Sequence, residues 1–485
     1  MKTGVRLLTA ALMTATLSAC AQLPSRPDPN EIPLLPIHTS MKPMPGPDAL
    51  PTRTSLPDPL VLNDGQSVRT EKQWLKRREE IRTTLEYYAV GQAPPPPGNV
   101  TGHLVSEQKL NDGKVNYRLV HLTFGPQESL CLDIGIFTPV GIPPAPAIIS
   151  PSGTPPGATP LPRLAQGANQ GKGQDALLVT GPMVSTPAPA GAQSPLYAAR
   201  VAGDPFRQRI AEEIAATNPA LAHGYAFVTF NYNDTGEDTT LRLADGSWAY
   251  RTTRFFPAYP NYDWGLLRAW AWGVSRIVDY LQTDPSVDKT RLIVTGVSRT
   301  GKSALVAGAF DDRIAMTAPV ASSGGGTPAF RFSGEGRGGK EGLTEMVRKY
   351  PNWFGPRLHE FWGQQDKLPF DQHWFLALCA PRPVISLEGT HDQNVNINGV
   401  YQSVLAARPV FSFLHADGKL GVNFADRPHG MVQDDWDALL AFADKYLLAK
   451  PVDRDFYTFP PELLKPAAPK SAGLAERTNQ SATGQ

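Results

Sequence analysis

The sequence predicts an α/β fold in which a mostly parallel, mixed sheet is sandwiched between helices. Two observations carry this prediction. From residue 224 onward, short apolar runs typical of buried strands alternate with longer segments of helical periodicity. In addition, the run at 291–296 leads directly through a glycine-flanked turn into a helical pattern at 303–311. This order is typical of sheets whose parallel strands are connected by helices.

The individual elements follow from local patterns. The charged, periodic segment 71–91 predicts a helix that ends at Gly91, immediately before a proline run. The predicted strands are 116–124, 132–139, 146–150, 225–234, 291–296, 315–322 and 381–392. The predicted helices of the later half are 263–284, 303–311 and 434–448.

Stretches rich in proline, glycine and polar residues mark the expected boundaries between segments of the chain. Residues 1–20 form a targeting segment, and the Pro-rich stretch 21–60 is interpreted as an extended tether. One large domain is expected at 61–450, with a Gly-, Ala-, Pro- and Gln-rich long loop or insertion at 152–195. The tail, 451–485, is expected to be partly disordered.

The targeting segment has the features of a secretory signal. Lys2 and Arg6 precede an apolar stretch too short for a stable membrane span. Residues 17–20 read Leu-Ser-Ala-Cys and resemble the bacterial lipobox, in which the cysteine is lipidated. We therefore expect Cys20 to anchor the protein by lipid alone, on the periplasmic side or at the outer-membrane surface. The alternative is an ordinary signal peptide with a chance cysteine.

Composition argues against several classes of function. The chain has 46 basic and 45 acidic residues and a net charge of +1, so no overall field favours nucleic acid. Three cysteines in 485 residues provide neither a disulfide scaffold nor zinc-ligand spacing. Cys131 and Cys379 either pair or remain buried thiols. No metal and no cofactor are predicted.

The stretch "VTGVSRTGK" is the first candidate for chemistry. Gly296 and Ser298 lie where a strand gives way to a helix, the position of the nucleophile in an α/β-hydrolase. The next glycine is Gly301, one place later than in the G-x-S-x-G pattern. The alternative is a serine that only caps the helix. We favour the nucleophile because suitable partners follow downstream.

Two cations follow the serine. The backbone N–H of Arg299 is where this fold places an oxyanion donor, and its guanidinium adds a charge. Lys302 lies one turn further on. Cations at a helix start oppose the helix dipole, which suggests a role in binding a polar substrate rather than solvation alone.

The order serine, acid, histidine of this fold selects the partners. His429 lies on a loop before the last helix and is the predicted base, whereas His373 is interpreted as structural. Asp392 follows a late strand and is the predicted acid, with Glu388 as its rival.

Several stretches together resemble one enzyme family. "DWGLLRAWAWGVSRIVDYLQTDPSVDKTRLIVTGVSRTGKSALVAGAFDDRIAMTAPVASSGGG", "YPNWF", "LPFDQHWFLALCAPRPV" and "RPHGMVQDDW" are similar to the bacterial glucuronoyl esterases (4-O-methyl-glucuronoyl methylesterases) of carbohydrate esterase family 15. The resemblance spans about residues 71–448, and Gly-x-Ser-Arg-x-Gly-Lys is its most specific motif. It implies an α/β-hydrolase with Ser298 as nucleophile, Arg299 as oxyanion stabiliser, Lys302 and Trp353 as substrate contacts and His429 as base.

The sequence departs from the family at three places. The family's glutamate in a "Glu-Ser-Gly" stretch is replaced by Ala321, so another residue must supply the acid. Some bacterial members resemble this chain in placing the acid after a late strand, the position of Asp392. The tryptophan that commonly follows the late aspartate is missing from "HDQNVN". A glutamate that some members place before the "WF" pair is also missing, and Tyr350 lies near its place.

The resemblance implies a serine esterase that cleaves esters between the glucuronic acid side groups of xylan and lignin alcohols. Its partner is then a plant cell-wall polysaccharide or lignin–carbohydrate ester, and we expect a monomer. Two alternatives stay open: an esterase for acetyl or other uronate esters of carbohydrates, and a non-catalytic glycan-binding surface lipoprotein.

Overall fold

The structure is a computed structural model that describes residues 39–142, 144–152, 205–240, 248–332 and 341–464. The strands are β1 (Thr101–Leu110), β2 (Val115–Phe124), β3 (Leu130–Pro139), β4 (Ala145–Ser152), β5 (Ala226–Asn231), β6 (Val287–Val297), β7 (Met316–Val320), β8 (Val384–Gly389) and β9 (Leu420–Ala425). The α-helices are α1 (Glu71–Leu85), α3 (Pro205–Thr217), α4 (Pro219–Ala222), α5 (Leu266–Leu281), α6 (Arg299–Phe310), α7 (Leu343–Lys349), α8 (His373–Cys379), α9 (Ile397–Phe413) and α10 (Gln433–Leu447). The π-turn η2 (Glu86–Val90) extends α1, and the 3-10 helices include η5 (Tyr232–Asp234), η8 (Phe330–Phe332), η9 (Pro356–Phe361) and η11 (Pro461–Leu463).

The described strands form one sheet of nine strands in the order β1-β2-β3-β5-β4-β6-β7-β8-β9. β1, β2, β3 and β5 pair antiparallel, whereas β5-β4-β6-β7-β8-β9 is parallel throughout. The predicted mostly parallel, mixed sheet is therefore confirmed. Because the strands from β4 to β9 run the same way, their carboxyl ends meet at one edge, where ligands bind in open α/β sheets.

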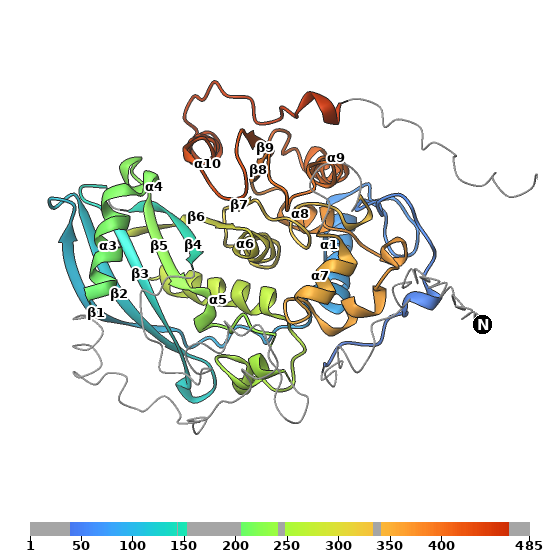
Figure 1. Cartoon of the computed structure of the whole chain (residues 1–485), viewed down its shortest axis with the longest axis horizontal. Helices are drawn as coiled ribbons and strands as arrows, with labels where there is room; N and C mark the ends of the chain where they lie inside the picture. The colour runs from blue at the N-terminus through green and yellow to red at the C-terminus, as the bar shows by residue number, and fades with distance from the viewer. Residues whose placement is uncertain (1–38, 143, 153–204, 241–247, 333–340, 465–485) are drawn as a thin grey trace, which may run out of the picture.

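Helices cover the sheet on both faces. α5 and α6 pack against the central strands β4 and β6, while α4 contacts β3 and β5, and α10 contacts β8 and β9 (Figure 1). α5 is buried along nearly its whole length because its sequence carries large apolar residues at helical spacing, including Trp270, whose ring is fully buried. At Gly273 an added Cβ would lie 2.5 Å from Thr235, so glycine there permits close packing of α5.

Several described elements have no counterpart among the sequence predictions, and β1, α9 and β9 show why. β1 is an edge strand that is buried at only one of its ten positions, so its apolar alternation is weak. Helix α9 contains Pro409, and proline ordinarily argues against a helix interior. β9 is a short strand, buried at four of its six positions, between α9 and the His429 loop. Tertiary packing decides all three.

The domain extends beyond both predicted boundaries. Residues 39–60, assigned to the tether, pack onto the domain: the carbonyl of Pro57 accepts hydrogen bonds from His373 Nε2 (2.7 Å) and Trp374 Nε1 (3.0 Å). At the other end Phe456 is buried, and its carbonyl accepts from the Val422 N–H at 2.7 Å. Apolar residues in both segments cover core surface. The predicted insertion at 152–195 falls almost wholly outside the described residues, as do positions 1–38 and 465–485.

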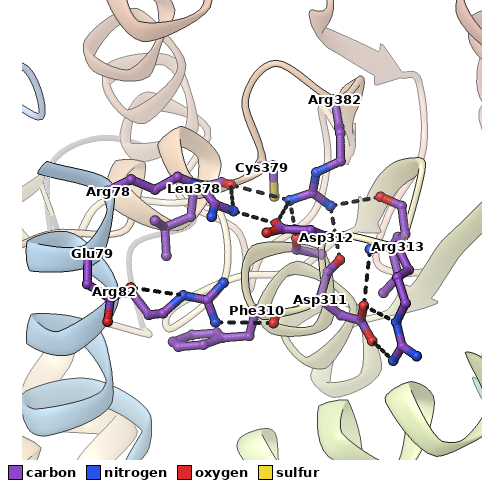
Figure 2. Close-up of polar contacts among 12 residues, drawn as sticks. Arg78, Glu79, Arg82, Phe310, Asp311, Asp312, Arg313, Leu378, Cys379 and Arg382 are labelled. Carbon is purple, nitrogen blue, oxygen red and sulfur yellow. Dashed lines mark hydrogen bonds and ion pairs between the residues drawn. The ribbon is translucent and has the colours of Figure 1, made fainter. Parts of the chain in front are cut away.

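Arginine side chains gather around the C-terminal end of α6, the helix that begins immediately after Ser298 (Figure 2). Arg382 donates to the carbonyls of Gly308 and Ile314, both at 2.7 Å, and Arg82 donates to that of Phe310 at 3.3 Å. Carbonyls at a helix end lack partners within the helix and carry partial negative charge, which cations stabilise. The arginines therefore fix α6 at the end opposite the candidate nucleophile.

The two remaining cysteines are both free and buried: Cys131 lies in β3 and Cys379 ends α8. Within the described part of the chain, no helix has the length and apolar character needed to cross a membrane.

Candidate active site

Ser298 occupies a strained turn between β6 and α6. Its backbone has φ 58° and ψ −118°, a conformation that non-glycine residues rarely adopt and that is found mostly at functional sites. Its N–H donates to the carbonyl of Val320 at 2.9 Å, which ties the turn to β7. Among the described residues, the Ser298 hydroxyl caps no helix N–H. The geometry is that of a nucleophile elbow, not of a helix cap.

The shifted third glycine of the motif has a structural reason. At Gly301 an added Cβ would lie 2.7 Å from the carbonyl oxygen of Val320 and 2.8 Å from that of Gly296, so β7 and the strand before the elbow approach too closely for a side chain. Thr300, at the usual glycine position, uses its hydroxyl to accept from the Val297 N–H at 2.9 Å. Thr300 thus stabilises the turn through its hydroxyl, while the absence of a side chain at Gly301 lets α6 pack closely against β6 and β7.

The sheet brings the predicted triad to one edge. Ser298 follows β6, Asp392 follows β8 and His429 follows β9, and these strands are parallel neighbours with only β7 between β6 and β8. Because parallel strands share the edge at which their carboxyl ends lie, all three residues belong to the same rim of the sheet.

His429 and Asp392 are directly hydrogen-bonded. Nδ1 of His429 lies 2.7 Å from Oδ2 of Asp392, whose side chain is fully buried. Burial alone raises the pKa of Asp392, but the hydrogen bonds from His429 and from the Asn394 N–H outweigh it, and the pKa lies below its ordinary value. With Nδ1–H donating to this carboxylate, Nε2 of a neutral His429 ring is the acceptor that a general base needs. The His429 side chain is 32% exposed, so it is accessible to substrate.

The loop that carries His429 is held by a buried ion pair that the sequence analysis did not identify. Arg427 contacts Asp435 of α10 through two bonds, from Nε at 2.5 Å and from Nη2 at 3.2 Å. The same carboxylate accepts from the Val432 N–H at 3.0 Å. Both side chains are almost completely buried. The ion pair therefore fixes both ends of the segment on which His429 lies.

The rival acid, Glu388, points elsewhere. It is the penultimate residue of β8 and is fully buried; its Oε1 accepts from Ser386 Oγ at 2.7 Å, and Ser386 contacts Thr327 Oγ1 at 2.8 Å. Burial raises the pKa of Glu388 to about 8. A carboxyl that is mostly neutral at pH 7 is poorly suited to stabilise an imidazolium. The carboxylate that is hydrogen-bonded to His429 is that of Asp392.

Arg299 and Trp353 meet at a third carboxylate. Asp238, in the loop after β5, forms an ion pair with Nη1 of Arg299 and accepts from Nε1 of Trp353 at 2.6 Å. The guanidinium also lies 5.5 Å from the centre of the Trp353 ring, onto which Tyr350 stacks at 3.9 Å. Asp238 was not among the predicted site residues. The available signal was its position just after a buried strand of the parallel part of the sheet.

Lys302 is enclosed. Its side chain is 1% exposed, its Nζ donates to Ser323 Oγ at 2.6 Å, and Glu341 lies at 3.6 Å. Burial lowers the pKa of Lys302 to about 8, although the charge of Glu341 opposes the shift. Trp353 is also buried. The predicted substrate contacts of Lys302 and Trp353 therefore stay predictions, since both polar groups already have protein partners.

The position expected for the family's glutamate is occupied by a buried backbone turn. Ala321 directly follows β7, has φ 45° and donates its N–H to the carbonyl of Leu387 at 2.8 Å. No side-chain acid is therefore available at that point. His373, interpreted as structural, is buried in α8, and burial lowers its pKa to about 4.

A hollow of about 290 Å³ adjoins the candidate acid, lined by Thr390, His391, Asp392, Gln393 and Ile397. The residues that the structure describes contain no cluster of acidic, histidine or cysteine side chains arranged to hold a metal ion. The side chains at this rim include a serine, a hydrogen-bonded histidine–aspartate pair and an arginine.

Comparisons with known proteins agree with this geometry. The family model described as glucuronyl esterase of fungi matches residues 198–415. Carbohydrate esterase MZ0003, from an unknown prokaryotic organism, is 28% identical over 410 residues, covering 81% of this chain and 90% of that protein. The 4-O-methyl-glucuronoyl methylesterase 1 of Wolfiporia cocos is 28% identical over 412 residues, covering 83% of each chain.

Solved structures give the same result. The glucuronoyl esterase from Solibacter usitatus is 25% identical with a TM-score of 0.61, covering 82% of this chain and 99% of that one. The family 15 glucuronoyl esterase from Caldicellulosiruptor kristjansonii is 26% identical with a TM-score of 0.59, covering 85% and 95%. By sequence and by fold, this chain is similar to the glucuronoyl esterases of carbohydrate esterase family 15.

Proposed function

We propose that this protein is a serine carboxylic ester hydrolase that releases glucuronic acid side groups of xylan from their esters with lignin alcohols. One observation carries the proposal: a strained Ser298 elbow and a His429–Asp392 pair with a 2.7 Å bond lie at the same rim of the sheet. The similarity to a 4-O-methyl-glucuronoyl methylesterase and to a glucuronoyl esterase supports the choice of substrate.

The reaction follows from the roles of these groups. Ser298 Oγ attacks the ester carbonyl carbon while His429 Nε2 takes the hydroxyl proton. Asp392, ionised because its pKa is lowered, stabilises the imidazolium that forms. The N–H of Arg299 at the start of α6, together with its guanidinium, stabilises the negative charge on the carbonyl oxygen.

The first step ends when the bond between the acyl carbon and the alcohol oxygen breaks and His429 returns the proton to the leaving alcohol. The uronate is then esterified to Ser298. Water, deprotonated by His429, attacks this second ester, and the free uronic acid leaves as Ser298 regains its proton. The sequence of steps needs no group beyond these side chains and water.

A broader ester specificity is the second candidate, and two observations favour it. The hollow beside Asp392 adjoins "HDQNVN", where the resemblance leads us to expect a tryptophan. One structural neighbour, 25% identical with a TM-score of 0.60, is described as a promiscuous family 15 esterase from a marine bacterial metagenome.

The test uses the fragment lacking residues 1–20, with Ser298→Ala as the control. Benzyl glucuronate, benzyl galacturonate and 4-nitrophenyl acetate are offered at equal concentrations. The proposal expects Ser298-dependent hydrolysis of the glucuronate ester well above that of the acetate. Comparable turnover of all three would favour the broader specificity. Absence of serine-dependent turnover on every ester would favour a glycan-binding protein.

We also propose that Cys20 is lipidated and that the mature protein is a periplasmic or outer-membrane-surface lipoprotein. The lipobox-like residues 17–20 after an apolar stretch support this proposal. Expression of the whole chain in a Gram-negative host, with labelled palmitate, tests it. We expect label in the membrane fraction and a shift of Cys20→Ala to the soluble fraction without label. Equal labelling of both chains would contradict it.

A further inference from the structure

We propose that Asp238 is a positioning residue for ester hydrolysis, which holds the Arg299 guanidinium beside the nucleophile before negative charge develops on the carbonyl oxygen. The inference rests on the proposed function, because it requires an ester that Ser298 attacks. It assigns a role to a residue in the loop after β5, which lies outside the triad.

The loop that carries Asp238 is held by its own asparagines. Asn231 Oδ1 accepts from the Asn233 N–H at 3.0 Å, and Asn233 Oδ1 accepts from the Asp238 N–H at 2.9 Å. Such side-chain-to-backbone bonds give a loop a defined shape. The Asp238 side chain is 11% exposed, so it is a fixed and largely desolvated carboxylate.

The two oxygens of Asp238 have different partners. Oδ2 pairs with Arg299 Nη1, and Oδ1 accepts from Trp353 Nε1 at 2.6 Å. With the Trp353 bond fixing one oxygen, the carboxylate presents the other to the guanidinium in a single orientation. The carboxylate therefore links three segments: the loop after β5, the first residue of α6 and the segment before η9.

The charges around Arg299 explain why such a partner is needed. Arg299 is the first residue of α6, where the helix dipole is unfavourable to a cation. The ammonium of Lys302 and the guanidinium each lie 5.5 Å from the centre of the Trp353 ring, and, besides burial, the charge of Arg299 lowers the pKa of Lys302, so the two cations repel each other. A flexible arginine without Asp238 would turn towards solvent, since its side chain is already 41% exposed.

Holding the guanidinium in place matters most in the transition state. Donors that are fixed before the reaction avoid reorganisation when the oxyanion forms. An interaction made only in the transition state lowers kcat when it is lost and leaves KM nearly unchanged. A purely structural tie between three segments would instead lower thermal stability, and its kinetic effect would not depend on Arg299.

The experiment is a double-mutant cycle on the glucuronate ester, with Asp238→Asn, Asp238→Ala, Arg299→Ala and the Asp238→Ala/Arg299→Ala double variant. Each Asp238 variant should lose about 10- to 100-fold in kcat with KM within about threefold, below the roughly 10²- to 10³-fold loss typical of removing an oxyanion donor itself. In the Arg299→Ala background, the further loss should be less than about threefold. Asp238→Glu, which keeps the charge, should recover part of the loss in kcat.

The control is Asp284→Asn, which breaks a more deeply buried ion pair, to Arg118 at 2.8 Å, after α5 and away from the rim. We expect unchanged kcat for this variant, and melting curves for all variants report on folding. Equal losses in kcat with and without Arg299, or a rise in KM alone, would overturn the inference. Serine-dependent turnover that is insensitive to Asp238 also overturns it and leaves the proposed function intact. Wild-type protein without serine-dependent turnover overturns both.

Discussion

Replacing Asp392 by asparagine removes the charge that stabilises the imidazolium of His429 and leaves the shape of the side chain almost unchanged. The two groups are 2.7 Å apart and the carboxylate is fully buried. At an effective dielectric constant of about 20, opposite unit charges at this distance attract by about 6 kcal/mol. Because each 1.4 kcal/mol or so of transition-state stabilisation is worth about tenfold, we expect kcat to fall by about 10⁴-fold.

The assay is the initial rate of uronate ester hydrolysis at pH 7, measured for wild type, Asp392→Asn and Glu388→Gln. Glu388 is the matched control because it is an equally buried carboxyl near the end of the same strand, bonded to Ser386 rather than to His429. We expect Glu388→Gln to remain within about twofold of wild type in kcat. Near-normal activity of Asp392→Asn, or an equal loss in Glu388→Gln, would refute the assignment of the acid.

Three further changes test how the fold supports the site. Glu388→Gln removes a carboxyl whose pKa burial raises to about 8, so its contribution to stability is present at low pH and is lost as the pH rises towards 8. Between about pH 5 and pH 7.5, wild type should therefore lose about 3 kcal/mol more unfolding free energy than the variant, as urea titrations would show; parallel pH profiles would contradict this. Asp435→Ala leaves Arg427 buried without its ion-pair partner, so we expect about 3–5 kcal/mol of destabilisation and a lower kcat. Denaturation measures the stability, and rates at a permissive temperature measure kcat. An unchanged denaturation midpoint would be inconsistent with a stabilising ion pair. Arg382→Ala removes donors to the carbonyls of Gly308 and Ile314 at the end of α6. Calorimetry should show a decrease of about 2–4 kcal/mol in the free energy of unfolding, whereas a decrease below about 0.5 kcal/mol would mean that water replaces the arginine.

The elbow at Ser298 could be predicted from the sequence because it depends on residues that are neighbours along the chain. The apolar run of β6, the glycines at 296 and 301 and the helical pattern of α6 together predicted the elbow. The order of Ser298, Asp392 and His429 along the chain, with each residue after a strand or before a helix, predicted the partners. The family resemblance added the substrate class, which no spacing of residues indicates by itself.

Only the tertiary structure distinguishes the partners of the two candidate carboxylates. Glu388 and Asp392 are four residues apart, and the sequence analysis left them as rivals. Glu388 lies within β8, where alternate side chains project onto one face of the sheet, so it shares a face with Ser386 and is buried there. Asp392 lies beyond the strand end, in a turn that reaches the loop after β9 and the His429 ring.

The sequence by itself determined the α/β architecture, the elbow serine and the histidine, because periodicity and turn residues act over a few positions. The partners of Arg299 and the burial of Lys302 needed the fold. Asp238 is 61 residues from Arg299 and 115 residues from Trp353 along the chain, and only the sheet topology brings the three together. The sequence shows which side chains can carry a charge, but their solvent exposure and their neighbours, which determine their roles, depend on the packed structure.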